Sequence, residues 1–370
     1  MTIYIVRRVF SGLLLVFALT WLAFALFWLV PAEPWRAIVF DPHPTQAEIK
    51  AADHKLGVDR PVVVQYGKFV WRIVRHFDFG KTYTGADVRA SIEHALPITW
   101  SIVGGGAVLL FLLAVPLGTL SALRANTGLD RAILMASIAG VALHPFIIGV
   151  GLKTLFASKL HWLPSYYYCP LRGSTPMTTC APGEAYSGYA FCAYHPCGGA
   201  GGWASHLALP WLTFAIIFLP LYMRMVRSAV IDVLEHQYVL TARAKGAGLI
   251  RLLRSHVLRN ALMQPLTMIG MEIGLALTVS IYIETMFSLH GAGMLAIGSL
   301  GFSSGVTTIS STGIPGVSGG SSGGSFDLST VAAVSFMIAL TVIVLNLLVD
   351  LAYAYLDPRV RLGRPDAATA

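Results

Sequence analysis

Residues 96–123 read LPITWSIVGGGAVLLFLLAVPLGTLSAL, a run of 28 residues without a charged side chain. A helix rises 1.5 Å per residue, so about 20 apolar residues cross the roughly 30 Å of membrane hydrocarbon. Backbone polar groups find no water there, and a single segment satisfies them only as a helix. This run therefore predicts a transmembrane helix, and the remainder of the chain is interpreted as a membrane protein.

The composition of the whole chain agrees with that interpretation. Hydrophobic residues make up 55% of the 370 residues and charged residues 12%, whereas soluble proteins carry about 25% charged residues. This deficit of charge argues against a cytosolic enzyme, a fibrous protein and a disordered chain. A net charge of +8 would suggest nucleic acid for a soluble protein, but in a membrane protein it reflects basic cytoplasmic loops. We therefore expect membrane lipid, and no nucleic acid, among the partners.

Six segments are long enough and apolar enough to cross the bilayer. The first follows Arg7-Arg8 but lacks the small-residue cleavage site of a signal peptide, so we expect it to be retained. The predicted fold is an all-α polytopic membrane protein with six transmembrane helices, at residues 9–30, 96–123, 132–157, 207–225, 265–287 and 330–356.

Lysine and arginine predict the orientation, because basic loops resist translocation while acidic residues have little effect. Fourteen basic residues fall on one side of the six spans, whereas the opposite loops at 158–206 and 288–329 hold only Lys159 and Arg172. Segment 31–95 carries nine basic and eight acidic residues, which suits a small extracytoplasmic domain. Both termini are therefore expected in the cytoplasm, in a multi-pass protein of the plasma (inner) membrane.

These expectations divide the chain into four parts. They are the first transmembrane helix at 1–30, the extracytoplasmic segment at 31–95, a core with five transmembrane helices at 96–362, and a cytoplasmic tail at 363–370. Within the core we expect an external cysteine-containing loop at 158–206, a cytoplasmic loop at 227–263 and a Gly/Ser-rich external loop at 288–329. The last loop has the composition of a flexible linker, and we interpret it as a passive surface loop.

All four cysteines lie in the first external loop, and this placement favours disulfides. Four cysteines allow three pairings, and the sequence does not choose among them. His195 and His206 make a metal site conceivable, but the cysteines lack the paired short spacing of zinc sites. We favour two disulfides over a metal site, formed by Cys169, Cys180, Cys192 and Cys197.

Ionisable residues at membrane depth are costly and therefore informative. Glu272 lies about 12 Å inside the fifth span, where its carboxyl would line a wet pathway or hydrogen-bond to a neighbouring helix. Glu284 and Lys153 lie near the outer ends of spans, so we expect their side chains to reach water. Gly270 and Gly274 are four residues apart, a spacing that favours close helix packing.

Motifs of catalysis are missing from the sequence. Gly80-Lys81-Thr82 resembles the end of a phosphate-binding loop, but Arg75 stands where that loop needs a glycine. There are no paired carboxylates, no HExxH motif and no nucleophile elbow. We therefore predict a protein that is not an enzyme and that holds no cofactor and no metal.

The cytoplasmic segment 227–263 is too long for a hairpin connection and rich in helix-forming residues, so we expect short helices. In residues 238–248, small side chains and two cations form a compact helix that a glycine can terminate. In residues 251–260, cations at intervals of three to five give a basic face opposite a leucine face. This composition alone fits anchoring on anionic lipid equally well.

Longer motifs in the same segment weigh against that simpler reading. Tyr-Val-x-Thr-Ala-Arg-Ala-Lys-Gly at 238–246 and His-x-Leu-Arg-Asn-Ala at 256–261 resemble the signature cytoplasmic loop of ABC-transporter permeases for dipeptides, oligopeptides and nickel. The similarity extends to Leu-Gly-Val-Asp-Arg-Pro at 56–61, Leu-Pro-Ile-Thr at 96–99 and Leu-Asp-Pro-Arg-Val-Arg at 356–361. The long segment after the first span and the Leu-Asp-Pro-Arg ending resemble the first of the two paired permeases of such systems.

This resemblance implies an importer subunit that works with a second homologous permease, two cytoplasmic ATPase subunits and an extracytoplasmic solute-binding protein. A helix of the cytoplasmic loop would dock into a cleft of the ATPase, and closure of the ATPases would switch the permease pair between inward-open and outward-open states. Peptides are the expected substrate, with nickel or another small solute as the alternative. The residues that the resemblance assigns to ATPase coupling are Tyr238, Thr241, Ala242, Arg243, Ala244, Lys245 and Gly246.

A stand-alone ion-coupled carrier is the competing class of protein. It would need several mid-membrane charges and an internal repeat of broken helices. The sequence offers one good candidate, Glu272, and no convincing repeat. Two departures from the resembled family remain: the loops at 158–206 and 288–329 exceed its usual lengths. Both are expected to face outward, where a binding protein would dock.

Overall fold

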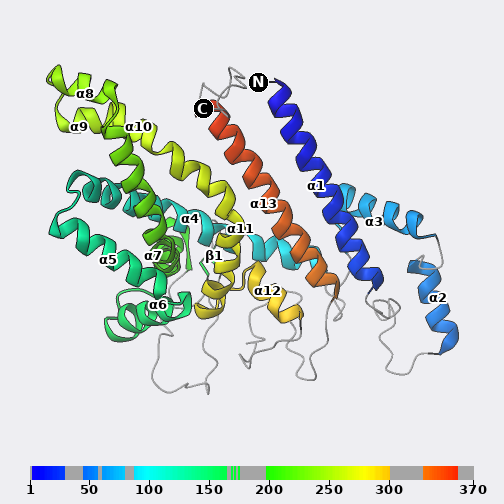
Figure 1. Ribbon diagram of the computed structural model, residues 1–370. Coiled ribbons are helices and arrows are strands. Elements are labelled where there is room, and N and C mark those ends of the chain that lie inside the picture. The colour runs from blue at the N-terminus through cyan, green and yellow to red at the C-terminus, as the bar shows by residue number, and fades with distance from the viewer. Residues whose placement is uncertain are drawn as a thin grey trace.

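The computed structural model describes residues 2–29, 45–56, 61–79, 87–164, 168–169, 171, 174–175, 197–300 and 328–356. Most of the Gly/Ser-rich loop, the tail at 363–370, Cys180 and Cys192 lie outside these residues. Within them the chain is helical apart from one short two-stranded ribbon (Figure 1). The prediction of a mostly α-helical protein is therefore confirmed.

Four helices are long enough and apolar enough to cross a membrane as single elements. Two further bent helix pairs meet the same test when each is counted as one span, which gives up to six. The expected count of six thus fits the structure only if these pairs are spans. The four long helices are α1 (Thr2–Leu29), α4 (Val88–Leu123), α7 (Gly199–Leu234) and α13 (Leu328–Leu356).

The core of the molecule is the packing of α4 along α7, each 36 residues long. Their buried apolar side chains form one cluster with residues of α11, among them Ile102, Phe214 and Ile283. Small residues let the two backbones approach closely, because a Cβ atom at Gly106 would lie 2.6 Å from the ring of Phe214. At 1.5 Å per residue, both helices are about 54 Å long and extend beyond the hydrocarbon of a membrane.

The third predicted span, 132–157, is not one straight helix. It is divided into α5 (Gly128–Ala142), α6 (Pro145–Leu152) and the π-helical segment η2 (Lys153–Lys159). The break falls at His144-Pro145, where the proline disfavours a helical conformation for the residue before it. The Nδ1 atom of His144 accepts a hydrogen bond from the backbone N–H of Phe146 and so caps α6.

The helix α11 (Met263–Met286) follows the fifth predicted span closely. The helical run from Leu249 to Met286 bends by 63° between Gly270 and Glu272. Gly270 faces Val349 of α13, whereas a Cβ atom at Gly274 would meet open space. A Cβ atom at Gly270 would lie 3.4 Å from a methyl group of Val349, an ordinary contact distance, so the close backbone approach expected at these two glycines is not seen within the described residues. After α11 the chain folds back into the short helix α12 (Ala292–Ser299), which packs on α4, α11 and α13.

Two short helices belong to the segment predicted after the first span, α2 (Gln46–Leu56) and α3 (Val62–His76). Tyr66 of α3 lies in an aromatic cluster with Trp21 and Phe24 of α1. Its hydroxyl group is hydrogen-bonded to Thr20 of α1 at 2.8 Å. This contact fixes α3 against α1. The ribbon pairs β1 (Ser174–Thr175) with β2 (Cys197–Gly198) in antiparallel register.

The segment expected to form short helices contains α8 (Gln237–Ala244), α9 (Leu249–Leu252), the π-helical turn η3 (Leu253–Val257) and α10 (Leu258–Ala261). These elements lie at the same end of the molecule as the start of α1 and the end of α13, and α12 lies toward the opposite end (Figure 1).

Candidate functional site

The helix α8 is held to the chain along one face and presents the rest to solvent. Val239 is 1% exposed and packs in a buried cluster with the C-terminal part of α7, Leu252 and Val257. Ala242 and Ala247 pack against the same cluster. We call this group the loop cluster. The other residues that the sequence assigned to coupling are exposed and, together with Ala242, form what we call the α8 surface: Tyr238, Thr241, Arg243, Ala244, Lys245 and Gly246.

Gly246 ends α8 in a left-handed conformation, with φ at +82°. Its N–H donates to the carbonyl of Arg243 at 3.0 Å, and the N–H of Ala247 donates to the carbonyl of Ala242 at 3.2 Å. This pair of bonds is the Schellman motif that closes a helix on a glycine. A Cβ atom at Gly246 would meet nothing within 4 Å. The glycine is therefore required here by its backbone conformation and not by crowding inside this chain.

The two sequence motifs of this segment touch each other. The amide Nδ2 of Asn260 donates a hydrogen bond to the hydroxyl of Tyr238 at 2.7 Å. The ring of Tyr238 also stands edge-on to that of His236, with centroids 5.6 Å apart. Tyr238 thus ties α8 to the helical residues after η3, a role that its place in the motif did not reveal.

The exposed side of this segment is strongly basic. Residues 237–263 contain five arginine and lysine residues and no acidic residue. All five cations are exposed, while Leu252, Val257 and Ala261 of the same segment are buried in the loop cluster. The expected division into a basic face and an apolar face is therefore present. The cations are Arg243, Lys245, Arg251, Arg254 and Arg259.

Two family models match the chain and together cover most of it. The model for the binding-protein-dependent transport system inner membrane component matches residues 114–362, which include α5 to α13. The chain belongs to this family. A second model, for the N-terminal part of such membrane components, matches residues 1–102 of the permease.

Relatives of known name resemble the permease over nearly its full length. A Brucella suis (biovar 1, strain 1330) protein whose name assigns it to the peptide permeases is 29% identical over 97% of this chain and 99% of its own. A probable peptide ABC transporter permease protein of Sinorhizobium fredii is 27% identical over 98% of this chain and 100% of its own. A probable D,D-dipeptide transport system permease protein of Escherichia coli K12 is 29% identical over 90% of each chain.

Glu272, the pathway candidate, lies in α11 directly after its bend. Its carboxyl lies close to the hydroxyl of Tyr222 on α7, a residue that is 3% exposed. One carboxyl oxygen, Oε2, is buried and has no hydrogen-bond partner in the described part of the permease. Buried polar atoms are nearly always paired, so this oxygen points to water, solute or another subunit as its partner.

An open apolar groove runs beside this pair. Residues of α4 between Ala107 and Pro116 line it together with Ile269 of α11. Phe111 of the groove packs edge-on against Tyr222, with ring centroids 5.5 Å apart. Ile269 stands before the bend and Glu272 after it, so this ring contact is what places the groove beside the pair. The groove and the Tyr222–Glu272 pair are thus neighbours.

The sequence led us to expect that the side chain of Glu284 reaches water. This expectation is wrong, because Glu284 is fully buried. Its carboxyl accepts hydrogen bonds from Thr99 Oγ1 at 2.6 Å and from the backbone N–H of Met294 at 3.0 Å. A Cβ atom at Gly293 would lie 3.0 Å from this carboxyl, so the start of α12 closes tightly over it. A carboxylate at a helix N-terminus satisfies otherwise unpaired N–H groups. Glu284 therefore fastens α12 to α4 and α11.

The remaining residues singled out from the sequence are Lys153 and the four cysteines. Lys153 donates from Nζ to the carbonyl of Met286 at 2.9 Å and is only half-buried. Cys169 is buried and disulfide-bonded. Cys197 contributes its backbone to the ribbon by pairing with Thr175. How Cys180 and Cys192, which lie outside the described residues, pair with the others stays a prediction.

Proposed function

We propose that this permease is one of two membrane subunits of an ATP-binding-cassette importer that carries peptides of the dipeptide and oligopeptide class. Membership of the family of binding-protein-dependent membrane components supports the importer. The names of the relatives, two for peptides and one for D,D-dipeptides, favour a peptide over nickel or another small solute. ATP hydrolysis is assigned to two partner subunits.

The α8 surface is the proposed docking site for the ATPase, and the single observation that carries this is its one-sided anchoring. Val239 holds the helix, while Thr241, Arg243 and Lys245 project into solvent. Because one face of α8 is anchored and the other is exposed, a partner that binds the exposed face can displace the helix as a rigid body. Five exposed cations in a segment, 237–263, that has no acidic residue suit acidic groups on a partner, which would steer docking by electrostatic attraction.

The end that carries α8, the start of α1 and the end of α13 is the proposed cytoplasmic side. The five exposed cations of the segment 237–263 lie at this end, in agreement with the preference of arginine and lysine for the cytoplasm. The opposite end, with α12, would then face the solute-binding protein. The four cysteines would lie on that outer side as two disulfides.

The second permease is proposed to cover the groove between α4 and α11. Val108 and Leu112 are 71% and 67% exposed there, and Leu275 of α11 is 54% exposed. The solute would pass between the two permeases, past the Tyr222–Glu272 pair. The Oε2 atom of Glu272, which has no partner among the described residues, supports this pathway, since a wet passage would supply one.

Reconstitution of the purified complex in vesicles tests the proposal. The vesicles contain this permease, the second permease, both ATPases and ATP on the ATPase side, with binding protein and a radiolabelled dipeptide on the other. We expect uptake only when every component and ATP are present. Vesicles with this chain alone and a proton or sodium gradient are the comparison, and uphill transport there would establish the ion-coupled carrier instead.

A further inference from the structure

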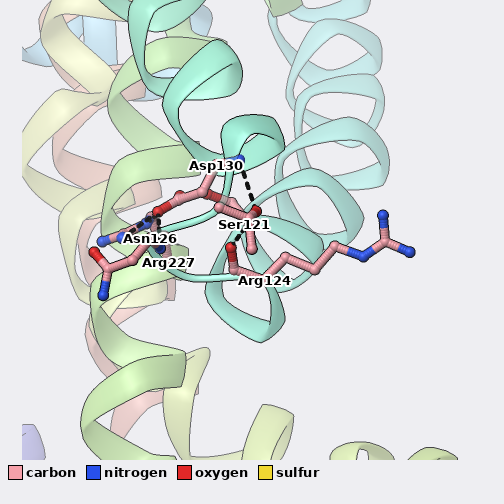
Figure 2. Close-up of polar contacts among 6 residues, drawn as sticks. Ser121, Arg124, Asn126, Asp130 and Arg227 are labelled. Atoms are coloured by element: carbon pink, nitrogen blue, oxygen red, sulfur yellow. Dashed lines mark hydrogen bonds and ion pairs between the residues drawn. The ribbon is translucent and has the colours of Figure 1, made fainter.

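An ion pair between a buried carboxyl and a partly buried guanidinium joins α5 to α7 close to the loop cluster. Asp130, in the first turn of α5, accepts two hydrogen bonds from the guanidinium of Arg227 on α7 (Figure 2). The Nε–Oδ1 and Nη2–Oδ2 distances are both 2.8 Å. The Asp130 residue is 2% exposed. Two parallel bonds from a planar guanidinium fix the angle between two groups as well as their distance.

The same carboxyl also holds the end of α4. Ser121, which is fully buried, donates its hydroxyl to Oδ1. The backbone N–H of Asn126, in the turn between α4 and α5, donates to Oδ2 at 2.9 Å. With the two bonds from Arg227, these donors use the four acceptor positions of a carboxylate. Asp130 therefore connects α4, α5 and α7 at a single point.

This connection adjoins the loop cluster that supports α8. Val226 and Val230 stand on either side of Arg227 in sequence, and both are fully buried in that cluster. Ala122, the neighbour of Ser121, belongs to the same cluster. A displacement of α8 is therefore passed through close-packed side chains to the residues around the ion pair, since packed interiors transmit strain.

The ion pair also leads toward the groove. Ser121 lies five residues after Pro116, the last groove residue of α4, and no break in the helix separates them. Pro116 removes one backbone hydrogen bond of α4, so a movement of the helix end reaches its middle through the packing of α4 on α7 as well as along the helix itself. The chain of contacts thus runs from α8 through the loop cluster and the ion pair to the wall of the proposed pathway.

We propose that the Asp130–Arg227 pair is the joint through which movement of the α8 surface reaches α4 and α5. Both are positioning residues, because they act through the helices they join and not through contact with the solute or with ATP. This inference rests on the proposed docking of an ATPase at α8. It requires that the joint be stiff, which the bidentate geometry supplies and a single charge contact would not.

Arg227→Lys is the test, because it retains the positive charge and most of the volume but cannot form the two-pronged contact. In the reconstituted complex we expect ATP hydrolysis within about twofold of wild type, while dipeptide uptake per ATP falls about tenfold. Arg131→Lys is the matched control, since Arg131 is the exposed neighbour of Asp130 on α5. We expect it to match wild type in both rates.

Three results would contradict this proposal. Unchanged dipeptide uptake per ATP in Arg227→Lys would show that the bidentate contact is not needed. An equal fall of ATP hydrolysis and of uptake would show only a loss of folding or of docking. An equal effect of Arg131→Lys removes the specificity of the pair. If Arg227→Lys lowers the yield of the complex, Asp130→Asn, which keeps the shape and one acceptor oxygen, is judged by the same ratio. Absence of ATP-dependent uptake in the wild-type complex would instead refute the proposed function.

Discussion

The hydroxyl of Thr99 lies 2.6 Å from the carboxyl of Glu284, although 185 residues separate them in the sequence. The same hydroxyl oxygen accepts a hydrogen bond from the backbone N–H of Ala292 at 2.9 Å. One threonine of α4 thus contacts both the end of α11 and the start of α12. The fold of this corner depends on a carboxylate that accepts several bonds at once.

Replacement of Glu284 by leucine should destabilise this corner. The Thr99 hydroxyl and the N–H of Met294 would lose their acceptor, and each buried donor left unpaired costs about 1–3 kcal/mol. We expect a clearly lower melting temperature of the purified permease complex in detergent, with Glu284→Gln between leucine and wild type. Thr285→Ser is the control, because Thr285 is exposed on the same helix. A leucine variant as stable as wild type would contradict the account.

Gly246→Val and Gly246→Asn separate backbone strain from side-chain volume at the end of α8. A β-branched residue at φ of +82° is strained by about 1–2 kcal/mol, whereas asparagine accepts the left-handed region more readily. We expect ATP-dependent uptake to fall about tenfold in the valine variant and to stay near wild type in the asparagine variant, measured in the reconstituted vesicles. Equal losses in both would assign the requirement to space at the docking surface instead.

Ala242→Asp and Ala244→Asp should both impair the permease, but the first by loss of stability and the second by weaker binding of the ATPase. Ala244 is exposed between Arg243 and Lys245, so its replacement places a negative charge on the docking surface without disturbing the core. We expect normal thermal stability and about tenfold weaker binding of the ATPase, measured by co-purification at several salt concentrations. Ala242 packs against the loop cluster, and an aspartate there should lower the melting temperature. If Ala244→Asp binds the ATPase normally, α8 is not the docking site.

Much of the helical architecture can be predicted from local sequence, because an uncharged apolar run of sufficient length indicates a membrane span. The boundaries of α11 and α13 match the prediction within a few residues. The break before α6 is indicated locally by the dipeptide His144-Pro145, but a prediction that only counts apolar residues over 132–157 does not detect it. Hydrophobic length predicts that a segment crosses the bilayer, but not that it does so straight.

Long-range polar contacts had no comparable signal. Glu284 lies near the end of its span, so position alone suggested contact with water, and only the fold-back of α12 buries it. Asp130 and Arg227 are 97 residues apart, and each resembles an ordinary charge at the end of a helix. Such pairs depend on which helices become neighbours, and hydrophobic periodicity does not encode this. The α8 surface was accessible to sequence reasoning because its motif is contiguous.

Glu272 offers a prediction in which transport falls while stability changes little. Glu272→Leu removes an oxygen, Oε2, that has no partner among the described residues, but it also leaves the buried Tyr222 hydroxyl without its acceptor, so the two effects on the melting temperature of the complex should nearly cancel. If the carboxyl lines a wet passage, the same variant should lower dipeptide uptake about tenfold, whereas Glu272→Gln keeps a polar surface and most of the uptake. Tyr222→Phe, which removes the hydroxyl that meets this carboxyl, is the matched control for the pair. Leucine and glutamine variants with equal uptake would leave Glu272 a packing residue, and the pathway would then have to lie elsewhere on α4 and α11.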